Sequence, residues 1–304
     1  MSSQTAPTNS RSLRVWLLRA RRALMFFIAL TLVAAGWELY KKFGPQDGGE
    51  VFGWKILPRA KDRVMPHVSE MFSRFGDPVG RRAEETVFSV VLDAVWFSLR
   101  LVLAGFAMGL IAGVSLAVVM TRFRFAERAI LPYLVISQTV PLIALAPLIA
   151  SWSGKLELFG WEWPRWMSAA VLGAFLSFFP IAVNTLRGLQ SPSPASLELM
   201  DSLAAPWHRT LFTLRFPSAV PYIVPGLKLG AAGAVIGVVV SEISIGLRGG
   251  IGRLVIEFAR ATTSDPAIVY TAIIGAAVLG LIMAALIAVA DTFFMRNRPK
   301  EIMS

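Results

Sequence analysis

A series of long apolar runs constrains the fold of this chain more than any other feature. Each run approaches or exceeds the roughly 20 residues that an α-helix needs to cross the apolar core of a bilayer. Inside lipid, a helix satisfies all its backbone hydrogen-bonding groups within one segment. The sequence therefore predicts an all-α membrane protein with six transmembrane helices, at about residues 23–40, 91–120, 129–151, 167–186, 222–240 and 269–290.

The composition fits the same class and excludes others. Of the 304 residues, 55% are hydrophobic and 16% are charged, and the formal net charge is +11. Much of the Lys and Arg flanks the apolar runs, which is typical of membrane topology and not of nucleic-acid binding. With no Cys and only two His, disulfides and thiolate metal sites are excluded, and no metal or cofactor site is expected in this chain.

The N-terminal region admits two interpretations. Residues 1–22 are predicted to form a basic cytoplasmic tail that is polar and disordered up to Ser10, and the first apolar run follows it. A charged stretch before an apolar core also describes a secretory signal, and Ala34-Ala35-Gly36 could serve as its cleavage site. The favoured interpretation is a retained first helix with a cytoplasmic N-terminus, which opens a transmembrane domain over residues 23–300.

The segment from Lys41 to about Thr86 is polar and contains many charges, Gly and Pro. Within it, Pro66 to Phe75 predicts a short amphipathic helix, because Pro suits a first helical position and the apolar residues share a face. We expect a solvated cap on the membrane domain.

Basic residues orient the spans. The predicted cytoplasmic pieces after the tail carry Arg122, Arg124, Arg128, Arg187, Arg209, Arg215, Arg296, Arg298 and Lys300. The two short outer loops carry Lys155, Arg165, Arg248, Arg253 and Arg260. Long loops weigh less in this rule, so both termini and the polar insertion 187–221 are predicted to be cytoplasmic.

This insertion separates two spans and predicts two short helices. Ser193 can cap the first helix, with Pro194 as its first residue. Glu198 and Asp201 are expected early in that helix, where its dipole favours carboxylates.

The second short helix is expected to start at Pro206. Trp207, Leu211 and Leu214 would share one of its faces. Pro217 and Pro221 are expected to close the insertion before the next span.

The insertion resembles the "EAA" loop of permease subunits of bacterial ATP-driven (ABC) importers. Glu198 matches the Glu of that pattern, Leu199-Met200 stand for its two Ala, and Phe216-Pro217 stand for its Leu-Pro. Ala204 takes the Gly position. Because Ala does not take positive φ as Gly does, a tighter or more helical turn is expected there.

The resemblance implies that this loop docks into a cleft on a cytoplasmic ATPase and couples it to the spans. Pro217 would set the angle between the docking patch and the membrane. The residues expected to form the patch are Glu198, Asp201, Ala204, Trp207, His208 and Arg209.

Polar residues inside the spans are candidates for a solute pathway, because such groups usually face a bundle interior or a water path. They are Ser137, Gln138, Asn184 and Glu242. Interhelical hydrogen bonding explains them equally well, and Glu242 could simply lie at the membrane interface.

A second resemblance concerns the Gly-rich segment from Ile245 to Leu254 and, more diffusely, the chain from Leu57 onward. It is similar to the outer loop of the permease branch that serves nitrate, sulfonates such as taurine, and thiamine or riboflavin precursors. Nucleotide binding by these glycines is not expected, because no strand–loop–helix unit surrounds them.

No nucleotide-hydrolysis or other catalytic motif appears, so the chain is not expected to be an enzyme, and ATP and Mg²⁺ would bind to a partner ATPase. The resemblance implies the type I permease fold in a bacterial inner membrane. Implied partners are a second permease copy, giving a homodimer, two ATPase subunits and an extracytoplasmic solute-binding protein. The alternatives are a stand-alone secondary transporter or channel and, less favoured, a membrane enzyme.

Overall fold

The computed structural model describes residues 9–51, 54–80, 83–153, 155, 157–158 and 161–295. The chain divides into two compact units. The first unit extends to Phe75 and includes Ala261–Ile268, and the second comprises Gly76–Arg260 and the residues from Val269 onward.

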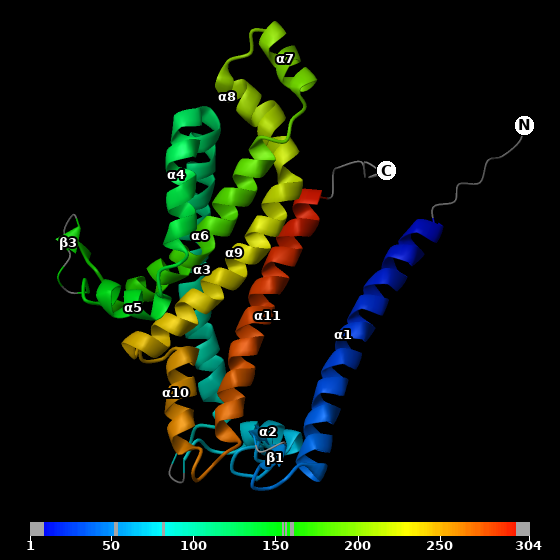
Figure 1. Ribbon diagram of the computed structural model, residues 1–304, viewed down its shortest axis with the longest axis vertical. Coiled ribbons are helices and arrows are strands. Elements are labelled where there is room, and N and C mark those ends of the chain that lie inside the picture. Colours follow the sequence, from blue (N-terminus) through cyan, green and yellow to red (C-terminus); the bar gives the residue numbers. More distant parts are fainter. Residues whose placement is uncertain are drawn as a thin grey trace, which may run out of the picture. The chain divides into compact units, whose positions relative to one another are not determined.

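The first unit is built on one long helix (Figure 1). This helix, α1, runs over Asn9–Phe43, so it begins well before the predicted span, and the predicted disorder at Asn9 and Ser10 is wrong. Residues 1–8 lie outside the described part of the chain. After α1 come the antiparallel strands β1 (Gly49–Val51) and β2 (Trp54–Leu57), the helix α2 (Val68–Ser73) and the 3₁₀ turn η1 (Arg74–Gly76).

The predicted short helix in the polar segment is confirmed as α2. The backbone N–H of His67 donates to Glu70 Oε2 at 3.0 Å, which satisfies a donor at the start of the helix. Of its apolar residues, Met71 is buried and Phe72 is 60% exposed, so the predicted apolar face is only partly covered.

The second unit is a helical bundle. Its helices are α3 (Val87–Arg122), α4 (Arg124–Ser137), α5 (Leu142–Ala150), α6 (Arg165–Leu189), α7 (Pro194–Ser202), α8 (Trp207–Thr210), the π-helical turn η2 (Leu211–Arg215), α9 (Phe216–Ile245), α10 (Ile251–Ala261) and α11 (Ile268–Met295). A two-stranded hairpin, β3 (Glu157–Leu158) with β4 (Trp161–Glu162), precedes α6.

The core of the bundle is α6, which packs against both α3 and α9 (Figure 1). Gly105, Gly109 and Gly113 recur at every fourth residue along α3 and lie against the backbone and small side chains of α6. A Cβ at Gly105 would lie 2.5 Å from the carbonyl oxygen of Ala170, so only Gly allows this approach. Such small-residue stripes bring membrane helices together, where lipid provides no hydrophobic drive for packing.

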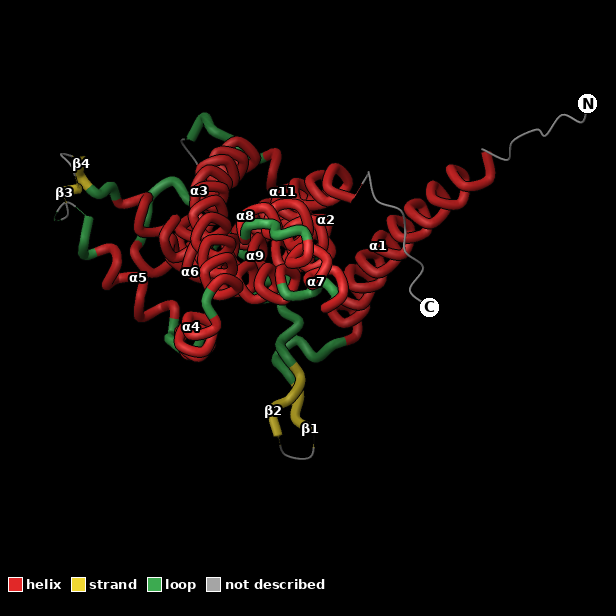
Figure 2. Tube along the Cα trace, turned by 90° about the horizontal axis from the view of Figure 1, so that it is seen from above, coloured by secondary structure: helices red, strands yellow, loops and turns green. Residues whose placement is uncertain are grey.

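The helices agree in length with a multi-pass membrane protein. Among the described residues, five helices are long and apolar enough to cross a bilayer, and six segments qualify if one bent pair counts as a single span. The bent pair is α4 with α5, which meet at 96°. In the view from above, α4 is seen end-on while α5 runs sideways (Figure 2).

The segment predicted as a span over 129–151 is therefore not one continuous helix. Pro141 precedes α5 and cannot donate a backbone hydrogen bond, and it favours an extended conformation at Val140. The hydroxyls of Ser137 and Thr139 donate to Leu134 O and Ile136 O, both at 2.8 Å. These bonds satisfy carbonyl groups at the end of α4, so the chain can turn there.

Candidate functional site

The loop between α6 and α9 projects beyond the ends of both helices (Figure 1). Its first helix, α7, begins at Pro194, and Ser193 Oγ accepts the N–H of Ser196 at 3.2 Å, as predicted. Glu198 lies in the middle of this nine-residue helix. Asp201 lies in the last turn, so its expected early position is wrong, and the helix dipole does not favour a carboxylate there.

The turn after α7 corrects a second expectation. Ala204 adopts a left-handed conformation with φ of +50°, although Ala was expected to avoid it. The N–H of Ala204 donates to Asp201 O at 2.9 Å, and the N–H of Ala205 donates to Met200 O at 3.0 Å. This pair of bonds defines a Schellman ending, in which the left-handed position is usually Gly. In this chain the left-handed position is Ala204, whose Cβ makes the conformation sterically less favourable than it would be for Gly.

The second predicted helix is not a separate element. From Trp207 the chain is helical through α8, η2 and α9 as far as Ile245. Pro217 and Pro221 lie inside this helical stretch and do not close the insertion. The wide turn η2 explains how Pro217 is accommodated: the N–H of Phe216 bonds to Leu211 O, five residues back, and a π-turn relieves the clash of a proline ring with the preceding turn.

Apolar packing and two cations fix this stretch to the bundle. Leu211 is buried and Trp207 is half-buried in a cluster that includes Met120 of α3. The guanidinium of Arg122, at the end of α3, lies 5.4 Å from the ring centroid of Trp207. Arg215 Nη1 donates to Leu189 O, the last residue of α6, at 2.8 Å.

The structure brings the predicted patch residues to one exposed loop. Trp207 is half-buried and Pro217 is exposed on the adjoining helix. Two apolar side chains add to this surface, with Leu199 60% and Leu203 67% exposed. The remaining predicted patch residues are all exposed, and they are Glu198, Asp201, Ala204, His208 and Arg209.

The hydrogen bonds of Ser137, Gln138 and Asn184 are made within α4, at its end, and within α6, and none of them joins two helices. Ser137 is bonded within α4, and Gln138 Nε2 donates to Ser137 Oγ at 3.4 Å. Asn184 Nδ2 donates to Pro180 O at 2.7 Å within α6. Both Gln138 and Asn184 are half-buried, so each side chain is partly accessible beyond these bonds.

Glu242, near the end of α9, is completely buried and joins three helices. Its Oε1 accepts the hydroxyl of Ser98 on α3 at 2.7 Å, and its Oε2 accepts the N–H of Gly252 on α10 at 2.9 Å. Ser98 Oγ in turn accepts the N–H of Ile251 at 2.9 Å. The first N–H groups of α10, which have no partner inside their own helix, thus donate to side chains of two other helices. The carboxylate of Glu242 takes the place that a bound anion takes at the start of other helices.

The Gly-rich segment before α10 makes room for this carboxylate. A Cβ on Gly250 would lie 2.3 Å from Glu242 Cδ, and one on Gly252 would lie 2.4 Å from Val239 O. We call Glu242, Ser98 and the start of α10 the α10 clasp. Sequence reasoning missed Ser98, Arg122 and Arg215 as structural partners, because a pairing over many residues leaves no local signal.

The sequence of the chain is similar to those of known transport proteins. A family model described as "Binding-protein-dependent transport system inner membrane component" matches residues 105–299. The formylaminopyrimidine transport permease protein ThiX of Halalkalibacterium halodurans is 35% identical over 52% of this chain and 58% of its own length. The putative aliphatic sulfonates transport permease protein SsuC of Bacillus subtilis is 28% identical over 50% of this chain and 52% of its own length. The matches thus span little more than half of these relatives.

Among solved structures, an amino acid ABC transporter with histidines matches 69% of this chain and 95% of its own. The TM-score is 0.50 and the sequence identity is 19%, a likeness that concerns the fold alone.

Proposed function

The chain belongs to the family of binding-protein-dependent transport system inner membrane components, and we propose that it is the permease subunit of an ATP-driven solute importer. The main support for this proposal is the exposed loop from α7 to α8, which contacts the ends of α3 and α6 and continues into α9. The patch offers acidic, basic and apolar side chains to a partner, among them Glu198, Arg209 and Leu203. Leu203 is 67% exposed, as expected of a residue that a partner covers.

In this proposal the patch docks on a cytoplasmic ATPase, which binds ATP and Mg²⁺ and carries out hydrolysis. Closure of two ATPase subunits moves the patches of two permease copies, which form a homodimer around the solute path. Because Trp207, Leu211 and Arg215 hold the loop against α3 and α6, a displacement of the patch moves these helices with it.

We extend the proposal to the location, the orientation and the cargo of the chain. A multi-pass protein of this family lies in the inner membrane, with both termini and the loop 187–221 on the cytoplasmic side. A solute-binding protein delivers the cargo on the other side. Relatives named for formylaminopyrimidine and for aliphatic sulfonates support a small organic anion or a vitamin precursor as cargo. Ser137, Gln138 and Asn184 are proposed to line the path.

Co-purification tests the coupling role. A tagged full-length chain is expressed in its native host, and the membranes are solubilised in mild detergent. The wild-type chain is expected to bring down an ATPase subunit, which mass spectrometry identifies by its nucleotide-binding motifs. Glu198→Lys is expected to lower the recovered ATPase at least tenfold, because it reverses a charge in the centre of the docking surface.

A matched control is Glu84→Lys, the same charge reversal at an exposed position before α3. It should leave ATPase recovery unchanged. A single Cys placed at His208 should react with a membrane-impermeant maleimide only after the membrane is opened. Recovery of no ATPase by the wild-type chain, or labelling of position 208 from outside the cell, would refute the proposal and favour a stand-alone transporter or channel.

A further inference from the structure

The C-terminal part of α1 has the features of a helix that leaves a bilayer. From Leu24 to Val33 its apolar side chains are exposed within the first unit, with Val33 at 72%, and the stretch from Leu24 to Phe43 is long and apolar enough to cross a bilayer. Its last two turns carry Trp37, Tyr40 and two Lys. Aromatic and basic residues gather where a span meets the headgroups.

The polar loop that follows is tied to this end of the helix. Trp37 Nε1 donates to Pro66 O at 3.0 Å, and Tyr40 Oη donates to Pro58 O at 2.8 Å. The loop is therefore held at the depth of the headgroups. Between it and α1 lies an open cavity of about 600 Å³, a size usual for small-molecule sites.

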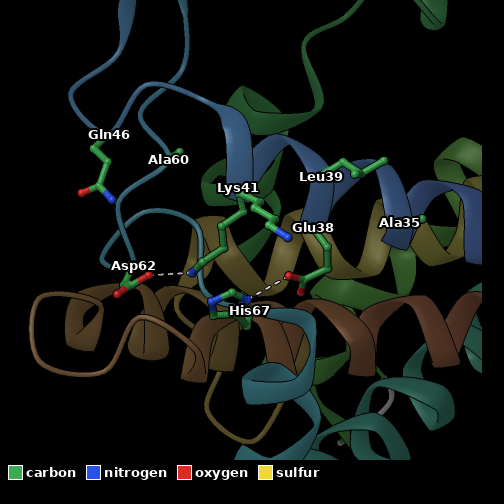
Figure 3. A pocket seen from close by; sticks show the side chains of 9 residues that line it. Ala35, Glu38, Leu39, Lys41, Gln46, Ala60, Asp62 and His67 are labelled. Carbon is green, nitrogen blue, oxygen red and sulfur yellow. Dashed lines mark hydrogen bonds and ion pairs between the residues drawn. The ribbon is translucent and has the colours of Figure 1, made fainter.

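The helix and the loop both line this cavity with charged and apolar side chains (Figure 3). From α1 the apolar side chains in the lining are Ala35 and Leu39, and Glu38 and Lys41 lie beside them. Farther along the chain, Lys42, Gln46 and Asp62 line it with polar groups. An amphiphile would match this mixed lining, with its headgroup on the charged side chains and its chains along the apolar part of α1.

One ion pair and one hydrogen-bonded pair cross the cavity, and neither of them involves Lys42. Lys41, with its side chain 5% exposed, bonds Asp62 Oδ1 at 2.7 Å and Met65 O at 2.6 Å. Glu38 accepts from His67 Nδ1 at 2.8 Å and from the N–H of Val68 at 2.7 Å. Lys42 is exposed, its Nζ lies 5.7 Å from the ring centroid of Phe43, and among the described residues no carboxylate pairs with it.

The cavity also offers a carboxylate. The side chain of Asp62 is 83% exposed, and one of its oxygens is bonded to Lys41. The hydrogen bond from Lys41 holds the pKa of Asp62 below its usual value, so the carboxyl stays ionised at neutral pH. The lining contains two Lys and two acids, so its charge is close to balanced and suits a zwitterion better than a strong anion.

We propose that this cavity binds the headgroup of a zwitterionic phospholipid with a primary ammonium, as in phosphatidylethanolamine. The phosphate lies against Lys42 Nζ, the ammonium lies near Asp62 and Gln46, and the acyl chains follow α1 past Leu39. The site belongs to the first unit alone and is independent of the transport role.

Lipid titration of the purified full-length chain tests the site. Native mass spectrometry in detergent follows the binding of palmitoyl-oleoyl phosphatidylethanolamine, phosphatidylcholine and phosphatidylglycerol. Phosphatidylethanolamine is expected to fill one saturable site. Phosphatidylcholine should bind more weakly, because its quaternary ammonium donates no hydrogen bond, and phosphatidylglycerol should bind more weakly because it has no cation for Asp62.

Variants locate the site. Lys42→Met and Asp62→Asn are each expected to weaken phosphatidylethanolamine binding about tenfold, the loss of one charge-assisted hydrogen bond. Lys42→Arg should restore most of the affinity. Lys61→Met is the matched control, because Lys61 pairs with Asp47 and does not line the cavity.

Three results would overturn the proposal. One is equal binding of the three lipids. Another is unchanged affinity in Lys42→Met when circular dichroism confirms a folded chain. The last is binding of soluble O-phosphoethanolamine as tight as that of the lipid, which would assign the cavity to a free solute.

Discussion

The α10 clasp predicts how the chain should respond to replacement of Glu242. In Glu242→Ala, the N–H of Gly252 and the hydroxyl of Ser98 lose their acceptor in a fully buried place. A buried donor without a partner costs about 1–3 kcal/mol. Two such donors together lower the free energy of unfolding by about 4 kcal/mol.

Glu242→Gln should cost much less. Its amide oxygen can still accept from Gly252, and its amide nitrogen can donate to Ser98, whose hydroxyl can rotate. What is lost is the attraction between a negative charge and the start of α10, about 1 kcal/mol. The two variants therefore separate loss of the hydrogen bonds from loss of charge.

Thermal unfolding in detergent, followed by fluorescence-detected size exclusion, provides the measurement. At roughly 2 °C per kcal/mol for a chain of this size, Glu242→Ala should lower Tm by about 8 °C and Glu242→Gln by about 2 °C. Gly250→Ala should resemble the Ala variant, since its Cβ would lie 2.3 Å from Glu242 Cδ. Gly280→Ala is the matched control, because no atom lies within 4 Å of a Cβ there.

The reasoning would fail if Glu242→Ala kept the wild-type Tm, or if the Ala and Gln variants lost equal stability. The first result would mean that the buried donors find other partners. The second would mean that charge, and not hydrogen bonding, holds α10. A role of Glu242 in a solute path predicts a different pattern, in which Glu242→Gln impairs transport at an unchanged Tm.

Two further predictions concern the loop between α6 and α9. Ala204→Gly should stabilise the end of α7 by about 1 kcal/mol, because Gly adopts positive φ without the steric cost of a Cβ. Amide hydrogen exchange in α7 should then become slower, and faster exchange would contradict the left-handed conformation of Ala204. The losses of stability in Arg122→Met and Trp207→Leu, measured by thermal unfolding, should differ from additivity in the double variant by about 1 kcal/mol, as expected for a cation–π pair partly shielded from water. Additive losses would show that the contact between the two side chains does not stabilise the fold.

The apolar spans and the start of α7 could be predicted from residues that are neighbours in the sequence. The apolar runs indicated spans, because lipid leaves a backbone few alternatives to the helix. Ser193-Pro194 indicated the start of α7, since a cap depends on residues three positions apart. These features need no knowledge of distant parts of the chain.

Other features depend on context that a local pattern does not contain. Pro132, Pro147 and Pro180 remain inside helices, whereas Pro141 follows a break between α4 and α5. All four are the same residue in apolar surroundings, so the sequence alone did not distinguish them. Likewise, the hydrogen-bond partner of Glu242 is Ser98, which lies 144 residues away in the sequence. The stripe Gly105, Gly109, Gly113 was a usable signal for close helix packing that the sequence reasoning missed.

The continuity of α8 and α9 connects the exposed patch of the loop between α6 and α9 to the α10 clasp. From Trp207 to Ile245 the helix spans 39 residues, which at 1.5 Å per residue is about 58 Å. Its irregular turn, η2, is held by Leu211 in the core and by Arg215 on Leu189, so bending there would break packing as well as a hydrogen bond. Under the proposed function, a force on the patch therefore reaches Glu242 through one rigid rod. It would move the start of α10, because the carboxylate of Glu242 is bonded to it.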